Sequence, residues 1–467
     1  MSKRIGMKPM SNAATCWFLK SLLVVACLSS SAFAGGNNNG GIGNGGFNFN
    51  NVGGVKIDAN GIIQNTSVED RAKLIDFLKR STKAPEGELG KKTEIRMVSL
   101  KGLEAAIQKA NVKELYELPA EIRYLAGLQR IQYIFLYPEK NDIVIAGPAE
   151  GWEFNEEGIM VGKTTRRPVL QLADLMTSLQ TARSAGEGQG ISVSIDPTQE
   201  GRQRYSQFMR QVRGLSPQVL AGARQAMGPQ EIKLTGVPTN SRYARILVAA
   251  DYQMKRLAMD LKEAPVGNLP SFLDLMQKRR STVSANVMPR WWLACSYEPI
   301  AKSGDGLAFE IKGQGVKAMT EDELVTAEGE VVGTGRKNPI AEQWANQMTE
   351  KYDELSVAET IFGELRNIMD MSVVGALVVR EEMLRKVNLE LPVLTGKVEL
   401  DTPDWPTPRA VDTQCSFMKV GRNTVVTASG GVLVDSWGVA DKQEESPMVG
   451  LVRTQADADG MSRWWWN

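Results

Sequence analysis

Apolar residues recur at helical spacing in the middle of the chain, between Thr239 and Leu261. Positions three and four apart share one face of the predicted helix: Leu247, Asp251, Met254, Ala258 and Leu261. Asp251 is the polar member of this face. It either stays at the edge of the face, paired with Lys255 one turn later, or enters the interior and needs polar partners there.

The pattern before this helix alternates between strands and helices. A hairpin is predicted around the Asn60-Gly61 turn, because alternating strand residues flank it. Further elements are expected at 94–98 (strand), 100–110 (helix), 131–146 (hairpin), 169–181 (helix) and 191–195 (strand). Asp196 is expected to cap the next helix, with Pro197 at its first position. Residues 55–235 therefore indicate an α/β domain.

After the central helix, the predicted strands and helices no longer alternate but come in blocks. A strand is predicted at 290–295, a hairpin at 306–319 and a helical block from Pro339, with 356–385 as its main part. Gly363 and Gly375 interrupt that part, which indicates either two helices or one bent helix. Residues from Val393 onward read as β-rich. We expect an α+β fold in which residues 236–467, with a tail at 445–467, pack on the first domain.

The first 34 residues have the pattern of an export signal. A basic start precedes the short apolar run SLLVVACL, and Ala32-Phe33-Ala34 forms a small-x-small cleavage site, so we expect cleavage after Ala34. A lipoprotein signal with Cys27 as the lipidated residue is the alternative. The following Gly/Asn-rich residues 35–54 are typical of a flexible linker. Localisation is therefore expected to be periplasmic or secreted.

Composition excludes several classes of protein. Neither the apolar run of the signal nor any other segment is long enough to cross a bilayer as a helix. Without the signal, 51 basic residues face 54 acidic ones, a net charge of −3, which gives no electrostatic footprint for nucleic acid. The chain has no histidine, so catalysis by Ser-His-Asp or Cys-His groups and His-ligated zinc are excluded. No cofactor or metal is expected.

Two cysteines, Cys295 and Cys415, remain outside the signal. An oxidising compartment would allow a disulfide between them, and two ordinary buried thiols are equally compatible with the sequence.

Several stretches resemble a known family: SRYARILVAADYQMKRLAMDLKEAPV, RWWLACSYEPI and GLAFEIKGQGVKAMTEDE, preceded by RRPVLQLADLMTSLQ and ISVSIDPTQEG. Their order is similar to that in a family of exported bacterial proteins, abundant in planctomycetes and defined only as a domain of unknown function. The resemblance covers most of the chain from Val55 onward. It implies export and one integrated architecture, but no activity or ligand.

Two pairs of polar residues are candidates for a ligand site. Asp251 and Lys255 could form a buried ion pair that serves acid/base chemistry or grips a ligand, or a common pair on the surface of a helix. Asp196 and Glu200 lie where a strand passes into a helix, which is a usual place for ligand sites. The structural alternative is a helix cap followed by an acid in the first turn.

Two clusters place arginine beside tryptophan. Arg290 precedes Trp291 and Trp292, and alternation along a strand would bury one of these indoles and expose the other. The second cluster is Arg463 followed by Trp464, Trp465 and Trp466 at the C-terminal end of the sequence. Both suit contacts with a carbohydrate or a partner, and core packing is the alternative for each.

The pattern as a whole favours a non-catalytic binding or scaffolding protein outside the cytoplasm. An unknown envelope protein or a polysaccharide is the expected partner, and nucleic acid is not. The alternative is a hydrolase without histidine that uses a carboxylate pair drawn from Asp196, Glu200 and Asp251, as in glycoside cleavage.

Overall fold

The computed structural model describes residues 55–57, 62–65, 85–214, 216–281, 287–326, 330–418, 424–456 and 463–467. The expected export signal and the Gly/Asn-rich linker lie outside the described residues. Those that are described belong to one compact unit, Asn48–Asn467. Its helices, as far as they are described, include none with the length and apolar character needed to cross a membrane.

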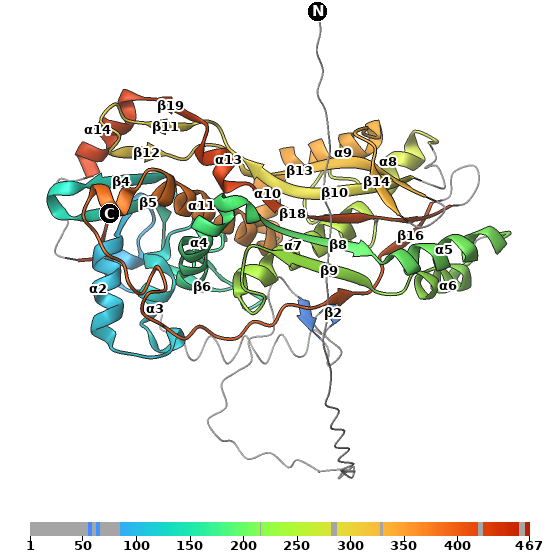
Figure 1. Cartoon of the computed structure of the whole chain (residues 1–467), viewed down its shortest axis with the longest axis horizontal. Coiled ribbons are helices and arrows are strands. Elements are labelled where there is room, and N and C mark those ends of the chain that lie inside the picture. The colour runs from blue at the N-terminus through green and yellow to red at the C-terminus, as the bar shows by residue number, and fades with distance from the viewer. Residues whose placement is uncertain are drawn as a thin grey trace, which may run out of the picture. The chain divides into compact units, whose positions relative to one another are not determined.

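The larger of two main sheets has nine strands in the order β1-β2-β15-β9-β8-β18-β10-β13-β14 (Figure 1). Neighbouring strands are antiparallel, except that β2 with β15 and β10 with β18 are parallel. The strands are β1 Val55–Ile57, β2 Ile62–Asn65, β8 Ile191–Pro197, β9 Gln230–Thr235, β10 Val287–Ser296, β13 Gly315–Val325, β14 Val331–Gly333, β15 Ala410–Val411 and β18 Ser429–Val434. The pairing of β1 with β2 confirms the first predicted hairpin.

The second sheet has seven strands in the order β19-β11-β12-β4-β5-β3-β20. They are β3 Thr93–Ser99, β4 Tyr133–Tyr137, β5 Asp142–Ala149, β11 Ile300–Lys302, β12 Ala308–Glu310, β19 Gln443–Glu445 and β20 Trp465–Trp466. Both main sheets combine strands from before and after residue 235, so the domain boundary expected there does not separate them. Two short hairpins complete the strands: β6 Trp152–Phe154 with β7 Met160–Gly162, and β16 Cys415–Met418 with β17 Thr424–Thr427.

The hairpin predicted at 306–319 is wrong. Its two strands, β12 and β13, belong to different sheets. β12 pairs with β4, whereas β13 pairs with β10 over ten positions, from Val287 opposite Leu324 to Ser296 opposite Gly315. The chain therefore crosses from one sheet to the other near Gly313, whose backbone has a φ of +110°.

Helices α4 (Leu172–Ser184), α7 (Arg242–Ala258) and α11 (Thr360–Arg380) lie between the two main sheets and share one hydrophobic core with them (Figure 1). The central helix α7 packs against β8 and β18 on one side and against α4 and α11 on the other. The described helices are α2 Leu100–Ala110, α3 Ala120–Arg123, α4 Leu172–Ser184, α5 Gln199–Gln211, α6 Pro217–Met227, α7 Arg242–Ala258, α8 Phe272–Lys278, α9 Pro339–Glu350, α10 Tyr352–Ala358, α11 Thr360–Arg380, α12 Met383–Lys386, α13 Ser436–Ala440 and α14 Pro447–Ala456. These helices and the mixed and antiparallel sheets confirm the predicted α+β class.

The predicted helical block at 356–385 is divided among α10, α11 and α12, but not at its glycines: α11 runs without a break through Gly363 and Gly375, so the alternative of two helices separated there is wrong. Both glycines permit close approach by other elements. A Cβ atom at Gly375 would lie 2.7 Å from the carbonyl oxygen of Ser178 on α4, closer than real Cβ atoms come to backbone oxygen. The missing side chain therefore allows α4 and α11 to pack closely in the core.

Candidate functional site

A pocket of about 1050 Å³ lies on one face of the nine-stranded sheet, over β9, β8, β18, β10, β13 and β14. Strand β8 shows how its floor is made. Ser192, Ser194 and Asp196 are half-buried and line this sheet pocket, while Val193 and Ile195, at alternate positions, have buried side chains. The strand therefore separates a polar pocket from the hydrophobic core around α7.

Asp196 is not the cap that the sequence predicts. β8 continues through Pro197, and the side chain of Thr198 caps α5 by accepting a hydrogen bond of 3.0 Å from the backbone of Gly201. Glu200 does lie in the first turn of α5. Asp196 and Glu200 both line the sheet pocket, so the structure brings these two predicted site residues together.

Arg290, Glu323 and Ser429 form a fixed polar network in the sheet pocket. Arg290 Nη1 donates to Glu323 Oε1 at 2.8 Å, and Ser429 Oγ donates to Glu323 Oε2 at 2.6 Å. Burial acts to lower the pKa of Arg290, but the hydrogen bond and charge of Glu323 outweigh it and raise the pKa. The network holds one guanidinium and one carboxylate in place before any ligand arrives.

The two neighbouring indoles of β10 point to opposite faces of the sheet. Trp291 is fully buried, with its ring 5.0 Å from Phe272 and 5.4 Å from Trp344 between ring centroids. Trp292 is half-buried and lines the sheet pocket on the same face as Arg290. Trp291 is thus a core residue, and Trp292 offers an aromatic surface to a ligand.

Acidic groups outnumber basic ones around the sheet pocket. Its described lining residues include six acids (Asp196, Glu200, Glu231, Glu321, Glu323 and Glu330) and three bases (Arg202, Lys233 and Arg290), which together carry a formal charge of −3. Burial lowers the pKa of Arg202, and the nearby Asp196, Glu323 and Glu200 charges oppose that shift. Within the described ranges, no group of three or more acidic or cysteine side chains is arranged to hold a metal ion.

Asp251 and Lys255 form a buried ion pair beneath the floor of the sheet pocket. Both are at most 1% exposed, and Lys255 Nζ lies 2.9 Å from Asp251 Oδ2 and donates to the carbonyl of Ile195 at 2.8 Å. Gly430, paired with Ile195 in β8 and Trp291 in β10, covers them. Burial raises the pKa of Asp251 to about 6, and Lys255 offsets this only in part. The pair supports the floor but does not line the pocket.

The terminal indoles pack against the protein's own second sheet. Trp465 and Trp466 form β20, which pairs with β3, and Trp465 is 8% exposed beneath the guanidinium of Arg96. Trp464 packs against the main core, and the ring nitrogen of Trp466 donates to Ala456. Trp465 is therefore a packing residue, while Trp464 and Trp466 remain half-buried.

Cys295 and Cys415 are free thiols. Cys295 lies in β10 of the large sheet and Cys415 in the short strand β16. Burial raises the pKa of both thiols, to about 12 for Cys295 and about 11 for Cys415, so neither is primed as a nucleophile at neutral pH.

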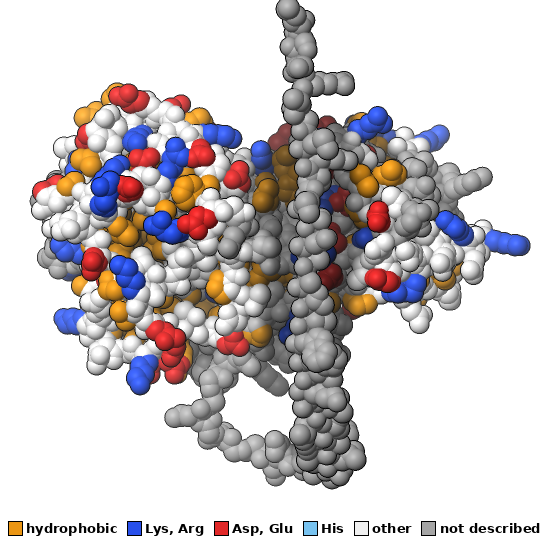
Figure 2. Space-filling model, in the orientation of Figure 1, with side chains coloured by type: hydrophobic (Ala, Val, Ile, Leu, Met, Phe, Trp, Pro, Cys, Tyr) orange, Lys and Arg blue, Asp and Glu red, His pale blue; other side chains and the backbone are white. Residues whose placement is uncertain are grey.

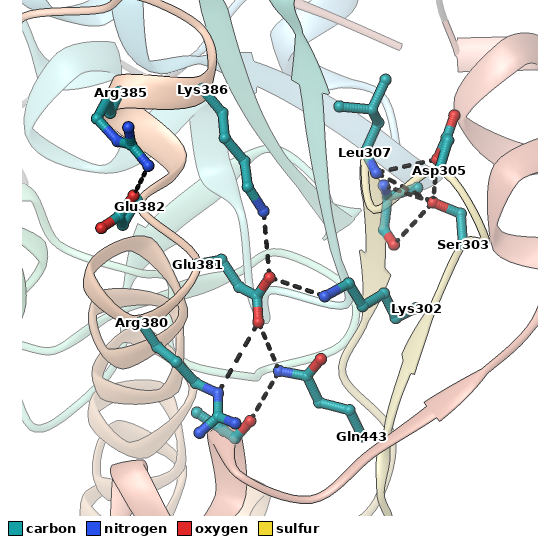
Figure 3. Close-up of polar contacts among 12 residues, drawn as sticks. Lys302, Ser303, Asp305, Leu307, Arg380, Glu381, Glu382, Arg385, Lys386 and Gln443 are labelled. Atoms are coloured by element: carbon teal, nitrogen blue, oxygen red, sulfur yellow. Dashed lines mark hydrogen bonds and ion pairs between the residues drawn. The ribbon is translucent and has the colours of Figure 1, made fainter.

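A further polar cluster lies at the end of α11, away from the sheet pocket. Glu381 accepts hydrogen bonds from Lys302 at 2.8 Å, Gln443 at 3.0 Å and Lys386 at 3.2 Å (Figure 3). Burial opposes these contacts, but together they lower the pKa of Glu381 to about 2. Because Glu381 joins α11 to β11 and β19, the cluster connects elements of the fold.

Most of the lining residues escape prediction from the sequence. Glu321 and Glu323 face the pocket from β13, Glu231 and Lys233 from β9 and Ser429 from β18. The alternation of polar residues along β9 is visible in the sequence, whereas β13 carries four consecutive polar residues at 320–323 and gives no such signal. Their convergence depends on strand pairings between segments more than a hundred residues apart, which local patterns do not encode.

Residues 193–272 match the family described as a protein of unknown function, DUF1598. The matched segment runs from β8 through α5, α6, β9 and α7 to the start of α8. It therefore supplies Asp196 and Glu200 of the sheet pocket and the buried Asp251–Lys255 pair. Neither the curated proteins nor the solved structures contain a match to the chain.

Proposed function

We propose that this protein binds a neutral, hydroxyl-rich ligand, such as a segment of polysaccharide, in the sheet pocket and performs no chemistry on it. The gathering of polar side chains around Trp292 supports this proposal most directly. Sugar rings carry hydroxyl groups that exchange hydrogen bonds with acids, arginines and serines, and an apolar ring face that can lie against an indole. A volume of about 1050 Å³ accommodates a small ligand or part of a larger one.

The charge of the sheet pocket favours a neutral ligand over an anionic one. With a formal charge of −3, the lining repels phosphates and acidic polymers. On the face drawn in Figure 2, the described basic and acidic side chains are intermixed. Selection against anions would therefore come from the pocket rather than from the overall charge of the molecule.

We place this binding outside the cytoplasm. Support comes from the basic start, the apolar run and the cleavage site before Gly35, and from the resemblance to exported planctomycete-type proteins. A polysaccharide of the cell envelope is an available neutral ligand in that location.

A carboxylate hydrolase is the second candidate, because Asp196 and Glu200 line the same pocket. Asp251 is not available for such a pair, since it is buried beneath the floor. Incubation with cellohexaose, followed by a reducing-end assay, separates the two candidates. We expect no new reducing ends; release that Asp196→Asn abolishes would favour the hydrolase.

Binding is tested by titrating the protein with cellohexaose and other neutral oligosaccharides by calorimetry. Trp292→Ala should weaken binding by about tenfold or more, roughly 1.4 kcal/mol, because it removes the stacking surface. Tyr116→Ala is the matched control, since Tyr116 is a 49% exposed aromatic residue outside the sheet pocket. Equal affinities for both variants and the wild type would reject the sheet pocket as the site.

A further inference from the structure

A second, smaller pocket of about 550 Å³ contains two arginines. Arg224 comes from the last turn of α6 and Arg256 from the last turn of α7, and residues 412–414 form part of the wall. We call it the arginine pocket. None of its described lining residues belongs to the sheet pocket, and its walls include the buried side chains of Tyr252 and Gln414.

Both guanidinium groups are held in place by backbone carbonyls. Arg224 Nη2 donates to Cys415 at 3.1 Å, and Arg256 Nη2 donates to Leu261 at 3.1 Å. Arg256 Nη1 also donates to the hydroxyl of Tyr252 at 3.4 Å, while its buried Nε atom has no hydrogen-bond partner among the described residues. Anchored guanidiniums with donors still unused are suited to recognising a planar anion in a fixed orientation.

Complementing the helix ends accounts for only part of this arrangement. Arginine in the last turn of a helix offsets the negative end of the helix dipole. An arginine can offset the helix dipole from an exposed position, however, so this role does not require two guanidiniums to face the same pocket. Across the described part of the chain, neither Arg224 nor Arg256 forms an ion pair within 4 Å. Asp412 is the one acid among the described lining residues, which leaves a formal charge of +1.

We infer that the arginine pocket binds a small molecule or group with a single carboxylate. A carboxylate is planar and matches the guanidinium fork, and its charge of −1 neutralises the pocket. A phosphate carries about −1.5 to −2 charges and would leave the pocket negative. The volume of about 550 Å³ lies within the range for small ligands. The inference does not rest on the proposed function, because the sheet pocket and its neutral ligand are separate.

Glucuronate and glucose provide a matched pair of probes, since they differ mainly in the carboxylate. We expect ligand-observed NMR titrations of the full chain to show glucuronate binding at least about tenfold more tightly than glucose, with a loss of affinity in high salt. Inorganic phosphate is the third probe. Binding of phosphate more tightly than glucuronate would overturn the assignment of a carboxylate.

Variants assign the binding to this pocket. Arg256→Gln and Arg224→Gln should each weaken glucuronate binding by about tenfold or more, and Arg256→Lys, which keeps the charge but loses the fork, should give an intermediate loss. Lys233→Gln in the sheet pocket is the control and should leave glucuronate binding unchanged. Circular dichroism checks that each variant is folded. Unchanged binding in folded Arg256→Gln, or an equal loss in Lys233→Gln, would overturn the inference.

Discussion

Replacing Glu364 by glutamine should remove most of one pH-dependent contribution to stability. Glu364 on α11 and Asp174 on α4 both accept hydrogen bonds from Arg242 of α7, and all three side chains are at most 7% exposed. One positive charge cannot neutralise two buried carboxylates. In addition, Asp174 Oδ1 and Glu364 Oε2 are buried and find no hydrogen-bond partner in the part of the chain that the structure describes.

The size of the effect follows from the titration of Glu364. Burial, only partly opposed by Arg242 and reinforced by Asp174, raises its pKa from 4.5 to about 7. The folded protein therefore holds a proton on Glu364 between these values while the unfolded chain has lost it, so stability falls as the pH rises through this window. The shift corresponds to at most about 3 kcal/mol, fully lost above about pH 7.

Urea unfolding between about pH 4.5 and pH 8 measures this contribution. Glutamine resembles the protonated carboxyl group, so Glu364→Gln and the wild type should have similar stability near pH 4.5. The variant should become the more stable protein by up to about 3 kcal/mol at pH 8. Glu342→Gln, on a 45% exposed side chain of α9, is the control and should run parallel to the wild type.

The opposite trend would refute this reasoning. If Glu364→Gln were less stable than the wild type at pH 8, and increasingly so as the pH rises, the attraction of Arg242 would outweigh the burial of Glu364. Parallel curves for the wild type and both variants would show that Glu364 keeps its ordinary pKa in the fold.

Two further predictions concern the floor of the sheet pocket and the core. Asp251→Asn should change the affinity for neutral sugars by less than about twofold, whereas Trp292→Ala should weaken it by about tenfold, because Asp251 lies beneath the floor. The stability of Asp251→Asn relative to the wild type should rise with pH between about 4 and 6. Burial raises the pKa of Asp251 to about 6, so the wild type loses stability as this carboxyl group ionises, whereas asparagine does not titrate. Gly375→Ala should destabilise the fold by about 1–3 kcal/mol in urea unfolding, although alanine favours helices, because its Cβ would meet the carbonyl of Ser178 at 2.7 Å. Gly267→Ala is its control, because the added Cβ has no neighbour within 4 Å among the described residues.

Each of these two predictions has an outcome that would contradict it. An Asp251→Asn variant that loses sugar binding while folded would place this carboxylate in the ligand site. A Gly375→Ala variant as stable as Gly267→Ala would mean that α4 and α11 can separate at little cost.

Elements with strong local signals could be predicted from the sequence. Helix α2 has the predicted bounds, since Ser99 caps it by accepting from Gly102 and Asn111 ends it in the left-handed region. The first hairpin follows from the Asn60-Gly61 signal, and its two strands are paired as expected. Local chemistry and hydrophobic spacing are enough to place such elements.

The sequence does not determine the structure at positions where two local patterns compete. Asp196 and Pro197 fit a helix start, but they equally continue the alternation of β8, and Thr198 provides a cap one residue after Pro197. The burial of Asp251 was open for a similar reason, because an Asp–Lys pair at this spacing suits both a surface and an interior. Tertiary packing decides both cases.

The sheet pocket could not be predicted as a site. Arg290 and Trp292 were candidates from their own short motif, but Glu323 and Ser429 reach them through the pairing of β10 with β13 and β18. The arginine pocket depends likewise on the ends of α6 and α7 meeting residues 412–414. Periodicity shows which face a residue occupies, not which distant strand lies beside it.

Hydrogen exchange with and without a bound neutral oligosaccharide tests the central claim most directly, because it reports where the ligand lies. With saturating cellohexaose, we predict slower exchange of backbone amides in β8, β10 and β18, which form the floor of the sheet pocket, and unchanged exchange in α14 and β20. Protection confined to α14 or β20, or no protection at concentrations that saturate binding, would contradict the assignment of the sheet pocket as the ligand site.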